Sequence, residues 1–336
     1  MKTLKIGING FGRIGRKVVR LALAHDDIEI VGINDLSKPE TMVHLLKHDS
    51  VHGKINADVR LEGSTLIVGS KKIALSSEKD PTALPWGKLG AEMVHECTGV
   101  FTDREKAALH LKGGTKRVVI SAPSKDPDAT LCMGVNHESY DPSKHVVVSN
   151  ASCTTNCLAP LVKVLDQNFG VVRGMMMTVH SYTNDQNVLD LAHKDLRRAR
   201  AAAMSQIPTT TGAAKAVGLV LPHLKGKIDG LSVRVPTPNV SLIDFTAEIK
   251  KAATKEEINA AFESAANGAL RGILAISNEP LVSCDYNGNL MSSTIDADCT
   301  AVIEGNLIKV LSWYDNESGF SQRMLDLSSY MAKKGI

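Results

Sequence analysis

Cys153 and Cys157 stand four residues apart in the stretch SNASCTTNC, among small polar residues and just after the apolar run HVVVS. Such a pair can bind a metal, form a disulfide, pack as apolar side chains or supply a nucleophile. A zinc site needs about four ligands, and no second Cys/His pair with suitable spacing stands out. The chain carries six irregularly spaced cysteines and no secretion signal. We therefore predict reduced thiols and no metal site.

The two cysteines differ in their predicted positions. Cys153 follows a predicted strand and opens the segment TTNCLAPLVKVLDQN, whose apolar residues fall at helical spacing. Cys153 is then at a helix N-terminus, where the partial positive charge favours a thiolate and hence a nucleophile. Cys157 lies about one turn inside, where it packs as a small apolar residue. We predict that Cys153 is the reactive thiol.

A catalytic thiol needs a base, and the chain offers eleven histidines. His180 ends the predicted strand RGMMMTVHSY and is followed by polar residues. By position alone, His180 is not distinguished from His193 or His223. All three remain candidates at this level.

A glycine-rich turn opens the chain between a predicted strand, TLKIGI, and a predicted helix. Gly10, Gly12 and Gly15 form the pattern G-x-G-x-x-G, which is typical of dinucleotide-binding turns. Glycines allow the backbone to approach a pyrophosphate, whose charge is met by N–H groups at the helix N-terminus. The sequence therefore predicts a dinucleotide site here.

Asp35 ends the next predicted strand, IEIVGIND, twenty residues after Gly15. A carboxylate at this position binds the ribose diol of NAD and repels the extra phosphate of NADP, so NAD is the expected cofactor. The alternative is that Asp35 only caps the turn before Ser37 and Pro39.

Further predicted strands alternate with helical segments through the first 150 residues: one over residues 64–75, and three that end at Thr98, Ser121 and Asn150. After residue 170 the strands are longer and the helical alternation is lost. We predict an α/β fold: a Rossmann-type doubly wound parallel sheet domain over residues 1–151 and an α+β catalytic domain with a mostly antiparallel or mixed sheet over 152–315.

A terminal helix over 316–336 is expected to complete the first domain. Its predicted apolar face carries Phe320, Met324, Leu327 and Met331, and Gly335 is the predicted stop signal.

Composition limits the other function classes. Of 336 residues, 43% are hydrophobic and 22% charged, which is ordinary for a globular protein. The net charge of +3 is spread along the chain and aromatic residues make up 4%, so nucleic acid is not expected as the main partner. No window resembles a signal peptide or a membrane span, so a cytoplasmic protein with no membrane partner is expected.

Seven ordered blocks resemble the phosphorylating glyceraldehyde-3-phosphate dehydrogenases over essentially the whole chain: INGFGRIGR, SNASCTTNCLAPL, TVHSYTNDQ, KDLRRARAAA, TTTGAAKAVG, RVPTPNVS and WYDNE. The resemblance implies that Cys153 is the nucleophile and His180 its base. It implies NAD-dependent oxidation of D-glyceraldehyde 3-phosphate to 1,3-bisphosphoglycerate, in glycolysis and gluconeogenesis, through a thiohemiacetal and a thioester that inorganic phosphate cleaves. It also implies a homotetramer, with the segment from about Ser181 to Ser205 crossing between subunits.

The resemblance also assigns the remaining site residues. Binding of substrate and phosphate is implied for Ser152, Thr154, Thr183, Arg198, Thr211, Gly212 and Arg234. NAD contacts are implied for Gly10, Gly12, Arg13, Ile14, Gly15, Asp35, Lys79, Ser121 and Asn316. The chain departs from many relatives at Lys79, at Phe320 and at Ala192, and Ala192 leaves some use of NADP open.

Two alternatives of other kinds remain. An erythrose-4-phosphate dehydrogenase has the same scaffold, but its members tend to lack the equivalents of Thr183 and of the TTTG run, both of which are present here. A nonenzymatic NAD-binding regulator needs the glycine turn but has no need of Cys153, His180 and phosphate donors together. The combination favours a phosphorylating glyceraldehyde-3-phosphate dehydrogenase.

Overall fold

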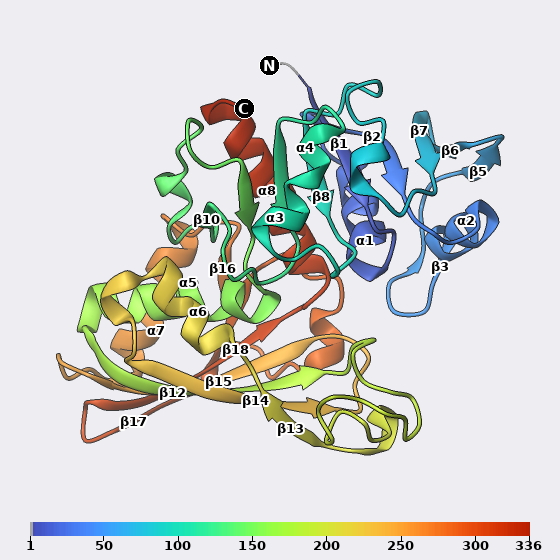
Figure 1. Ribbon diagram of the computed structural model, residues 1–336. Coiled ribbons are helices and arrows are strands. Elements are labelled where there is room, and N and C mark those ends of the chain that lie inside the picture. The colour runs from blue at the N-terminus through green and yellow to red at the C-terminus, as the bar shows by residue number, and fades with distance from the viewer. Residues whose placement is uncertain (1–2) are drawn as a thin grey trace. The chain divides into compact units, whose positions relative to one another are not determined.

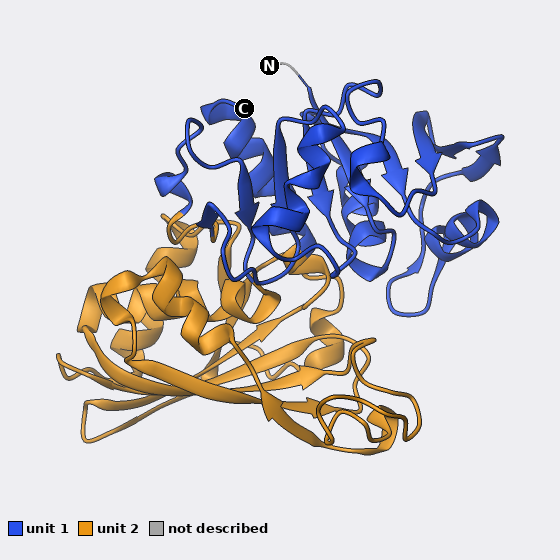
Figure 2. Cartoon of the chain, in the orientation of Figure 1, with its two compact units in different colours: residues 1–131, 137–151, 321–336 blue, residues 132–136, 152–320 orange. Residues whose placement is uncertain are grey.

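The computed structural model describes residues 3–336, and these form two compact units (Figures 1 and 2). Unit 1 holds the chain up to Leu131, His137–Ala151 and Ser321–Ile336, and unit 2 holds Cys132–Asn136 and Ser152–Phe320. The assignment of residues 1–151 with 316–336 to NAD binding and of 152–315 to catalysis stays a prediction.

Unit 1 is built on a nine-stranded sheet with the order β10-β11-β9-β8-β1-β2-β7-β6-β5. Its strands are β1 (Leu4–Asn9), β2 (Ile28–Asn34), β5 (Val59–Glu62), β6 (Thr65–Val68), β7 (Lys71–Ser76), β8 (Met93–Glu96), β9 (Arg117–Ile120), β10 (Ala129–Thr130) and β11 (Val147–Ser149). Neighbours from β10 to β7 pair in parallel, so their carboxyl ends lie along one edge of the sheet. This is the predicted doubly wound sheet.

The far edge of this sheet differs from the sequence prediction. The segment over residues 64–75, expected as one strand, is the hairpin β6–β7, and β5 extends it by a second antiparallel pairing. Gly69 at the hairpin turn has φ +59°, a backbone conformation that favours glycine. The hairpin forms because the turn at Gly69 interrupts the apolar run.

The remaining elements of unit 1 connect or cover these strands. They are α1 (Arg13–Ala22), α2 (Pro39–Lys47), β3 (His48–Asp49), β4 (Gly53–Lys54), η1 (Pro81–Ala83), α3 (Arg104–Ala107), α4 (Leu109–Lys112), η2 (His137–Ser139) and most of α8 (Ser318–Lys334). The predicted apolar face of α8 is buried at Phe320, Met324, Leu327 and Met331. Gly335 follows α8 with φ +115°, as expected of a helix stop signal.

Unit 2 is built on a seven-stranded mixed sheet with the order β13-β14-β12-β15-β18-β17-β16. Its strands are β12 (Val171–Ser181), β13 (Ile207–Thr210), β14 (Ile228–Val235), β15 (Ser241–Ile249), β16 (Leu274–Ser277), β17 (Ser293–Ile303) and β18 (Leu307–Tyr314). β12 pairs with β14 and β16 with β17 in parallel, and the other neighbours are antiparallel. The predicted mixed sheet is confirmed.

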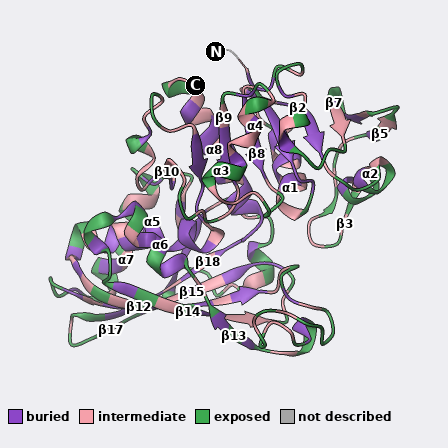
Figure 3. Ribbon diagram, in the orientation of Figure 1, coloured by how far each residue is buried: buried purple, intermediate pink, exposed green. Residues whose placement is uncertain are grey.

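Three helices pack on one face of the unit 2 sheet (Figure 1). They are α5 (Cys153–Phe169), α6 (Ala213–Val220) and α7 (Lys255–Asn267), and the short helices η3 (Ala202–Met204), η4 (Pro222–Leu224) and η5 (Ser283–Tyr286) lie in the connections. α5 is buried over most of its length and packs against β15, β17, β18 and both other helices. The elements α5, β8 and β9 are largely buried (Figure 3). Packing around them therefore fixes the direction in which their side chains, and those at their ends, point.

Candidate active site and cofactor-binding loops

Cys153 is the first residue of α5, as the sequence predicts. Ser152 is the N-cap, and its Oγ accepts a hydrogen bond from the backbone N–H of Thr155 at 3.0 Å. Ala151, just before the cap, has φ +57°, a left-handed conformation that is uncommon for a residue with a side chain. This sharp entry into α5 sets the Cys153 thiol at the positive end of a long buried helix.

The imidazole ring of His180 contacts the Cys153 thiol. The Nε2 of His180, near the end of β12, is 3.6 Å from the Cys153 Sγ. His193 instead faces Asp185, and His223 faces Asp166. Of the three candidate histidines, His180 is therefore the one in contact with the Cys153 thiol, and its role as base stays a prediction.

Two neighbours of opposite hydrogen-bonding character face the Nδ1 atom of His180. The carbonyl oxygen of Ser181, 2.7 Å away, can only accept and favours the tautomer with the proton on Nδ1. The Nη1 of Arg234, 2.9 Å away, can only donate and favours the tautomer with the proton on Nε2. Nε2 is the atom that faces the Cys153 sulfur, and in the first tautomer it can take a proton from the thiol.

Burial favours the neutral forms of both partners. Burial and, to a smaller extent, the nearby Arg234 together lower the pKa of His180 to about 3. Burial also raises the pKa of Cys153, and this effect outweighs the opposing effects of Arg234 and Thr154. Burial thus opposes the thiolate that the helix N-terminus favours, and the thiolate at Cys153 stays a prediction.

Arg234 lies opposite His180 because β14 pairs with β12 in that register. Its Nη1 donates to the carbonyl oxygen of Ser181 at 3.1 Å and lies 2.9 Å from the His180 Nδ1. Its Nε is buried and has no hydrogen-bond partner among residues 3–336. The guanidinium thus adds a positive charge beside the Cys153–His180 pair and retains a donor for an anion.

Tyr314 is a site residue that the sequence reasoning did not single out, although it lies in the block WYDNE. Its hydroxyl is 2.9 Å from the Thr154 Oγ1 and 2.8 Å from the Thr178 Oγ1. Its ring stands edge-on to His180, with the centroids 6.0 Å apart. Tyr314 therefore ties α5, β12 and β18 together under the thiol.

Cys157 lies in the core, as predicted. It is fully buried, and its Sγ is 3.4 Å from the Ser312 Oγ. Burial raises the pKa of Cys157 to about 12, so its thiol stays protonated. All six cysteines are free thiols.

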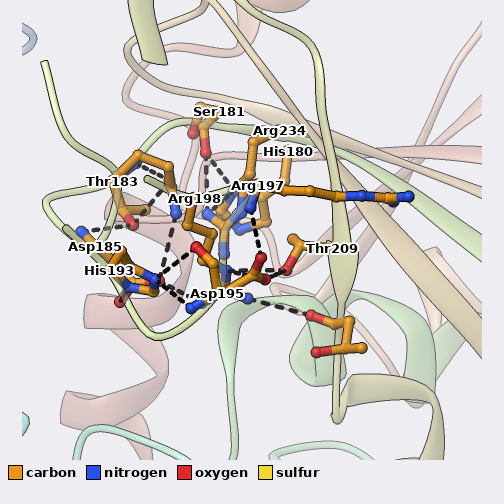
Figure 4. Close-up of polar contacts among 12 residues, drawn as sticks. His180, Ser181, Thr183, Asp185, His193, Asp195, Arg197, Arg198, Thr209 and Arg234 are labelled. Atoms are coloured by element: carbon orange, nitrogen blue, oxygen red, sulfur yellow. Dashed lines mark hydrogen bonds and ion pairs between the residues drawn. The ribbon is translucent and has the colours of Figure 1, made fainter. Parts of the chain in front are cut away.

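Arg198 belongs to a polar cluster on the segment between β12 and β13 (Figure 4). Its Nη1 contacts the Asp185 carboxylate, its Nε donates to the Thr209 Oγ1 at 2.9 Å, and its Nη2 donates to the Thr210 carbonyl. A second carboxylate, that of Asp195, accepts from the Thr209 hydroxyl at 2.8 Å. The two carboxylates hold Arg198 in place, a role the sequence did not reveal.

The other predicted phosphate ligands are distributed around these groups. Thr183 lies beside Asp185 in Figure 4 and donates its backbone N–H to the Gln186 side chain. Thr211 and Gly212 precede α6, and neither makes a hydrogen bond to Arg198 or Arg234 within residues 3–336. His180 is thus in direct contact with both Cys153 and Arg234, and the described residues show no such hydrogen bond for Thr211 or Gly212.

In unit 1, the three glycines of the turn have different surroundings. Gly10 has φ +94°, and a Cβ built on Gly15 would lie 2.1 Å from the Gly10 carbonyl oxygen, so both positions require glycine for the fold. A Cβ built on Gly12 would meet nothing within 4 Å. Gly12 is exposed at the N-terminus of α1, where a ligand phosphate can approach the backbone.

Asp35 follows β2 and is tied to the glycine turn. Its carboxylate accepts from the backbone N–H of Phe11 at 2.7 Å and from that of Ser37 at 2.8 Å. Burial alone would raise the pKa of Asp35, but these hydrogen bonds and the charge of Arg16 lower it below its usual value. The carboxylate therefore stays ionised, as recognition of a ribose diol requires.

The remaining predicted cofactor contacts fall on both units. Arg13 donates to the Asp49 carboxylate at 2.7 Å, Ile14 is half-buried on α1, Lys79 is exposed after β7, and Ser121 follows β9. Asn316, in unit 2, accepts hydroxyl hydrogen bonds on its Oδ1 from Ser181 and Ser241. Its amide nitrogen is left without a partner within residues 3–336.

The described part of the chain has neither a cluster of metal ligands nor a membrane-spanning helix. No group of three or more His, Cys, Asp or Glu side chains in residues 3–336 is arranged to hold a metal ion. Within the same range, every helix is too short or too polar to span a bilayer.

Comparison with known proteins decides the family. Residues 4–104 match the family model described as "Glyceraldehyde 3-phosphate dehydrogenase, NAD binding domain", and residues 152–316 match the model of its C-terminal domain. The chain belongs to the glyceraldehyde-3-phosphate dehydrogenase family. The predicted α/β fold class, the dehydrogenase activity and the NAD cofactor are thereby confirmed.

Curated members of the glyceraldehyde-3-phosphate dehydrogenase family match along the full length. The chain is 62% identical over 333 residues to a glyceraldehyde-3-phosphate dehydrogenase of Geobacillus stearothermophilus, a match covering 99% of each chain. It is 60% identical to glyceraldehyde-3-phosphate dehydrogenase 1 of Bacillus subtilis (strain 168), again over 99% of each. It is 55% identical to the enzyme of Xanthobacter flavus, over 99% of this chain and 100% of the relative.

Proposed function

We propose that this chain catalyses the NAD-dependent oxidation and phosphorylation of D-glyceraldehyde 3-phosphate to 1,3-bisphosphoglycerate, with Cys153 as nucleophile and His180 as base. The observation that carries the proposal is the 3.6 Å separation between the Cys153 Sγ and the Nε2 of His180. The similarity to dehydrogenases named for this substrate supports the same reaction.

The first step uses the neutral pair. The Cys153 sulfur bonds to the aldehyde carbon while its proton passes to the His180 Nε2, and the imidazolium protonates the new alkoxide to give a thiohemiacetal. His180 then removes this hydroxyl proton as the carbon is oxidised to a thioester. NAD supplies the hydride acceptor. Nε2 is the ring atom that faces the sulfur, so it exchanges the protons in this scheme.

The second step regenerates the thiol. Inorganic phosphate attacks the thioester carbon, an acyl phosphate is formed, and the thiolate that leaves takes back the proton held by His180. Anion binding in these steps is proposed for Ser152, Thr154, Thr183, Arg198, Thr211, Gly212 and Arg234. The buried, unpartnered Nε of Arg234 supports a phosphate position at that side chain.

The proposed NAD contacts are Gly10, Gly12, Arg13, Ile14, Gly15, Asp35, Lys79, Ser121 and Asn316. The open space at Gly12 supports binding of the pyrophosphate, and the ionised Asp35 supports binding of the ribose. The Asn316 amide, whose oxygen is already held by two hydroxyls, can donate to the nicotinamide carboxamide. These residues fit the cofactor.

We further propose a cytoplasmic homotetramer in which the segment from about Ser181 to Ser205 contacts a neighbouring subunit. Exposed apolar side chains on this segment support the proposal, among them Val188, Leu189 and Leu191. Such a patch on a lone chain is typical of a subunit interface. Analytical ultracentrifugation tests it: a monomer at micromolar concentration would contradict the tetramer.

A steady-state assay tests the reaction. Oxidation of glyceraldehyde 3-phosphate is followed with NAD and with NADP, each with and without inorganic phosphate. We expect turnover with NAD that stops after one equivalent when phosphate is omitted. Faster turnover of erythrose 4-phosphate would favour the alternative enzyme, and continued turnover without phosphate would contradict the phosphorylating mechanism.

A further inference from the structure

A chain of buried polar side chains joins the carboxyl ends of the central strands in unit 1. Its members, here called the buried relay, are Trp86, His110, Glu96, Asn9 and Asn34, and each is at most 4% exposed. None of them takes part in the chemistry proposed above. A buried carboxylate and two buried amides are costly unless every polar atom is paired, so their arrangement calls for a physical reason.

The direction of each hydrogen bond in the buried relay is fixed by its partners. The indole N–H of Trp86 can only donate, and it lies 3.1 Å from the His110 Nδ1. The proton of His110 is then on Nε2, which donates to the Glu96 Oε2 at 2.9 Å. The Asn9 amide nitrogen donates to the same oxygen at 2.6 Å. Glu96 thus orients both neighbours.

The relay continues from Asn9 to the next strand. Because its nitrogen faces Glu96, Asn9 presents its Oδ1 to the Asn34 Nδ2 at 2.8 Å. Asn34 holds the loop after β7 from both sides: its Oδ1 accepts from the Glu78 backbone N–H at 2.8 Å, and its Nδ2 donates to the Glu78 carbonyl at 2.9 Å. The hydrogen bonds therefore run without a break from Trp86 to Glu78.

The other oxygen of Glu96 holds the loop after β8. Its Oε1 accepts from the backbone N–H of Thr98 at 2.7 Å and from the Thr98 hydroxyl. The backbone of Thr98 packs against the glycine turn, since a Cβ on Gly10 would lie 2.7 Å from the Thr98 nitrogen. One carboxylate therefore fixes both this loop and the start of the turn.

Two members of the relay, and the residue that Asn34 holds, are each next in sequence to a proposed cofactor contact. Asn9 precedes Gly10, Asn34 precedes Asp35, and Glu78 precedes Lys79. We propose that Asn9, Asn34 and Glu96 are positioning residues that hold these loops in the geometry that binds NAD, without touching NAD themselves. This inference rests on the proposed function.

The effect on affinity follows from preorganisation. Loops already held in their binding geometry do not lose conformational freedom when the ligand arrives. Removing the Asn34 amide breaks its bonds to Asn9 and to Glu78, so the loops after β2 and β7 must be ordered by NAD itself. We therefore expect the dissociation constant for NAD to rise roughly tenfold in Asn34→Ala, which corresponds to about 1.4 kcal/mol.

The experiment compares Asn34→Ala with Ser328→Ala in the full-length protein. Ser328 also bonds a buried side chain of unit 1, the His95 ring, at 2.7 Å, but lies outside the relay. For each variant we would measure the dissociation constants of NAD and ADP-ribose by calorimetry, the KM for glyceraldehyde 3-phosphate and kcat at saturating NAD. Asn34→Ala should weaken both nucleotides by the same factor and leave kcat and the substrate KM within about twofold, whereas Ser328→Ala should change none of the four.

A second pair of variants covers the case in which Asn34→Ala does not fold. Thr98→Val removes the hydroxyl bond to Glu96 and keeps the side-chain shape, and Thr98→Ser restores that bond. We expect Thr98→Val to weaken ADP-ribose binding about threefold or more and Thr98→Ser to recover most of the loss.

The outcomes separate this inference from the proposed function. If the unmodified protein does not bind NAD, the proposed function fails. If it binds NAD and the variants of Asn34 and Thr98 bind ADP-ribose equally well, the positioning role is wrong. A parallel fall in kcat, substrate affinity and nucleotide affinity would also overturn it, because that pattern reports general loss of structure.

Discussion

A buried histidine in unit 1 makes the stability of this protein depend on pH in a way that can be calculated. His95, on β8, is fully buried, and its single hydrogen bond runs from the ring Nε2 to Ser328. Its Nδ1 has no partner within the part of the chain described, residues 3–336. Burial lowers the pKa of His95 from 6.5 to about 3, so the folded protein keeps this ring neutral.

The sign and the size of the effect follow from linkage. The unfolded chain binds a proton on His95 as the pH falls below 6.5, and the folded chain does so only near pH 3. The neutral His95 therefore does not destabilise the folded protein above pH 6.5. As the pH falls from 6.5 towards 3, proton binding by the unfolded chain lowers the free energy of unfolding. Between pH 7.5 and pH 5 the free energy of unfolding should fall by about 2 kcal/mol because of this residue alone.

The assay measures urea unfolding at both pH values for the unmodified protein and for His95→Gln. Glutamine can still bond the Ser328 hydroxyl but does not titrate. The pH-dependent loss of stability should shrink by about 2 kcal/mol in His95→Gln and stay unchanged in Ser328→Ala, which retains the imidazole. An unchanged pH dependence in His95→Gln would refute the reasoning, since it would mean that the folded protein also protonates His95.

Three further predictions concern the site. Arg234→Gln removes a charge that lowers the pKa of Cys153, so alkylation of Cys153 by uncharged iodoacetamide should slow at pH 8 and its pH profile should move upward; an unaltered profile would contradict this. Asp35→Gly should raise the ratio of kcat/KM for NADP to that for NAD, and a constant ratio would place the discrimination elsewhere. Tyr314→Phe leaves the hydroxyls of Thr154 and Thr178 without this partner, so urea unfolding should show a loss of about 1–3 kcal/mol, whereas no loss would mean that these bonds are replaced.

The parts of the fold that local patterns encode could be predicted from the sequence. The glycine turn, the parallel strands and the terminal helix each depend on residues close together in the chain. A local signal of the same kind marks α7, where Thr254 and Glu257 form a reciprocal capping box at the N-terminus. The hairpin β6–β7 was not predicted, although Gly69 and the polar residues 70–72 between two apolar stretches are a local turn signal.

The site could be predicted less completely because its contacts depend on strand register. The pairing of β12 with β14 sets Arg234 opposite His180, and no local pattern specifies that register. The ion pair between Asp185 and Arg198 likewise depends on how the long segment between β12 and β13 folds. The position of Cys153 at a helix N-terminus was apparent from the sequence, whereas the burial that raises the pKa of its thiol was not.

The central claim is that Cys153 forms the covalent intermediate with His180 as its base. The most direct measurement mixes the enzyme with glyceraldehyde 3-phosphate and NAD without phosphate, quenches in acid and locates the acyl group by peptide mass spectrometry. We expect one acyl group on Cys153, slower acylation in His180→Ala by a factor of about a hundred or more, and no acylation or turnover in a Cys153→Ser variant that still binds NAD. An acyl group on another cysteine, or full activity in Cys153→Ser, would contradict the account.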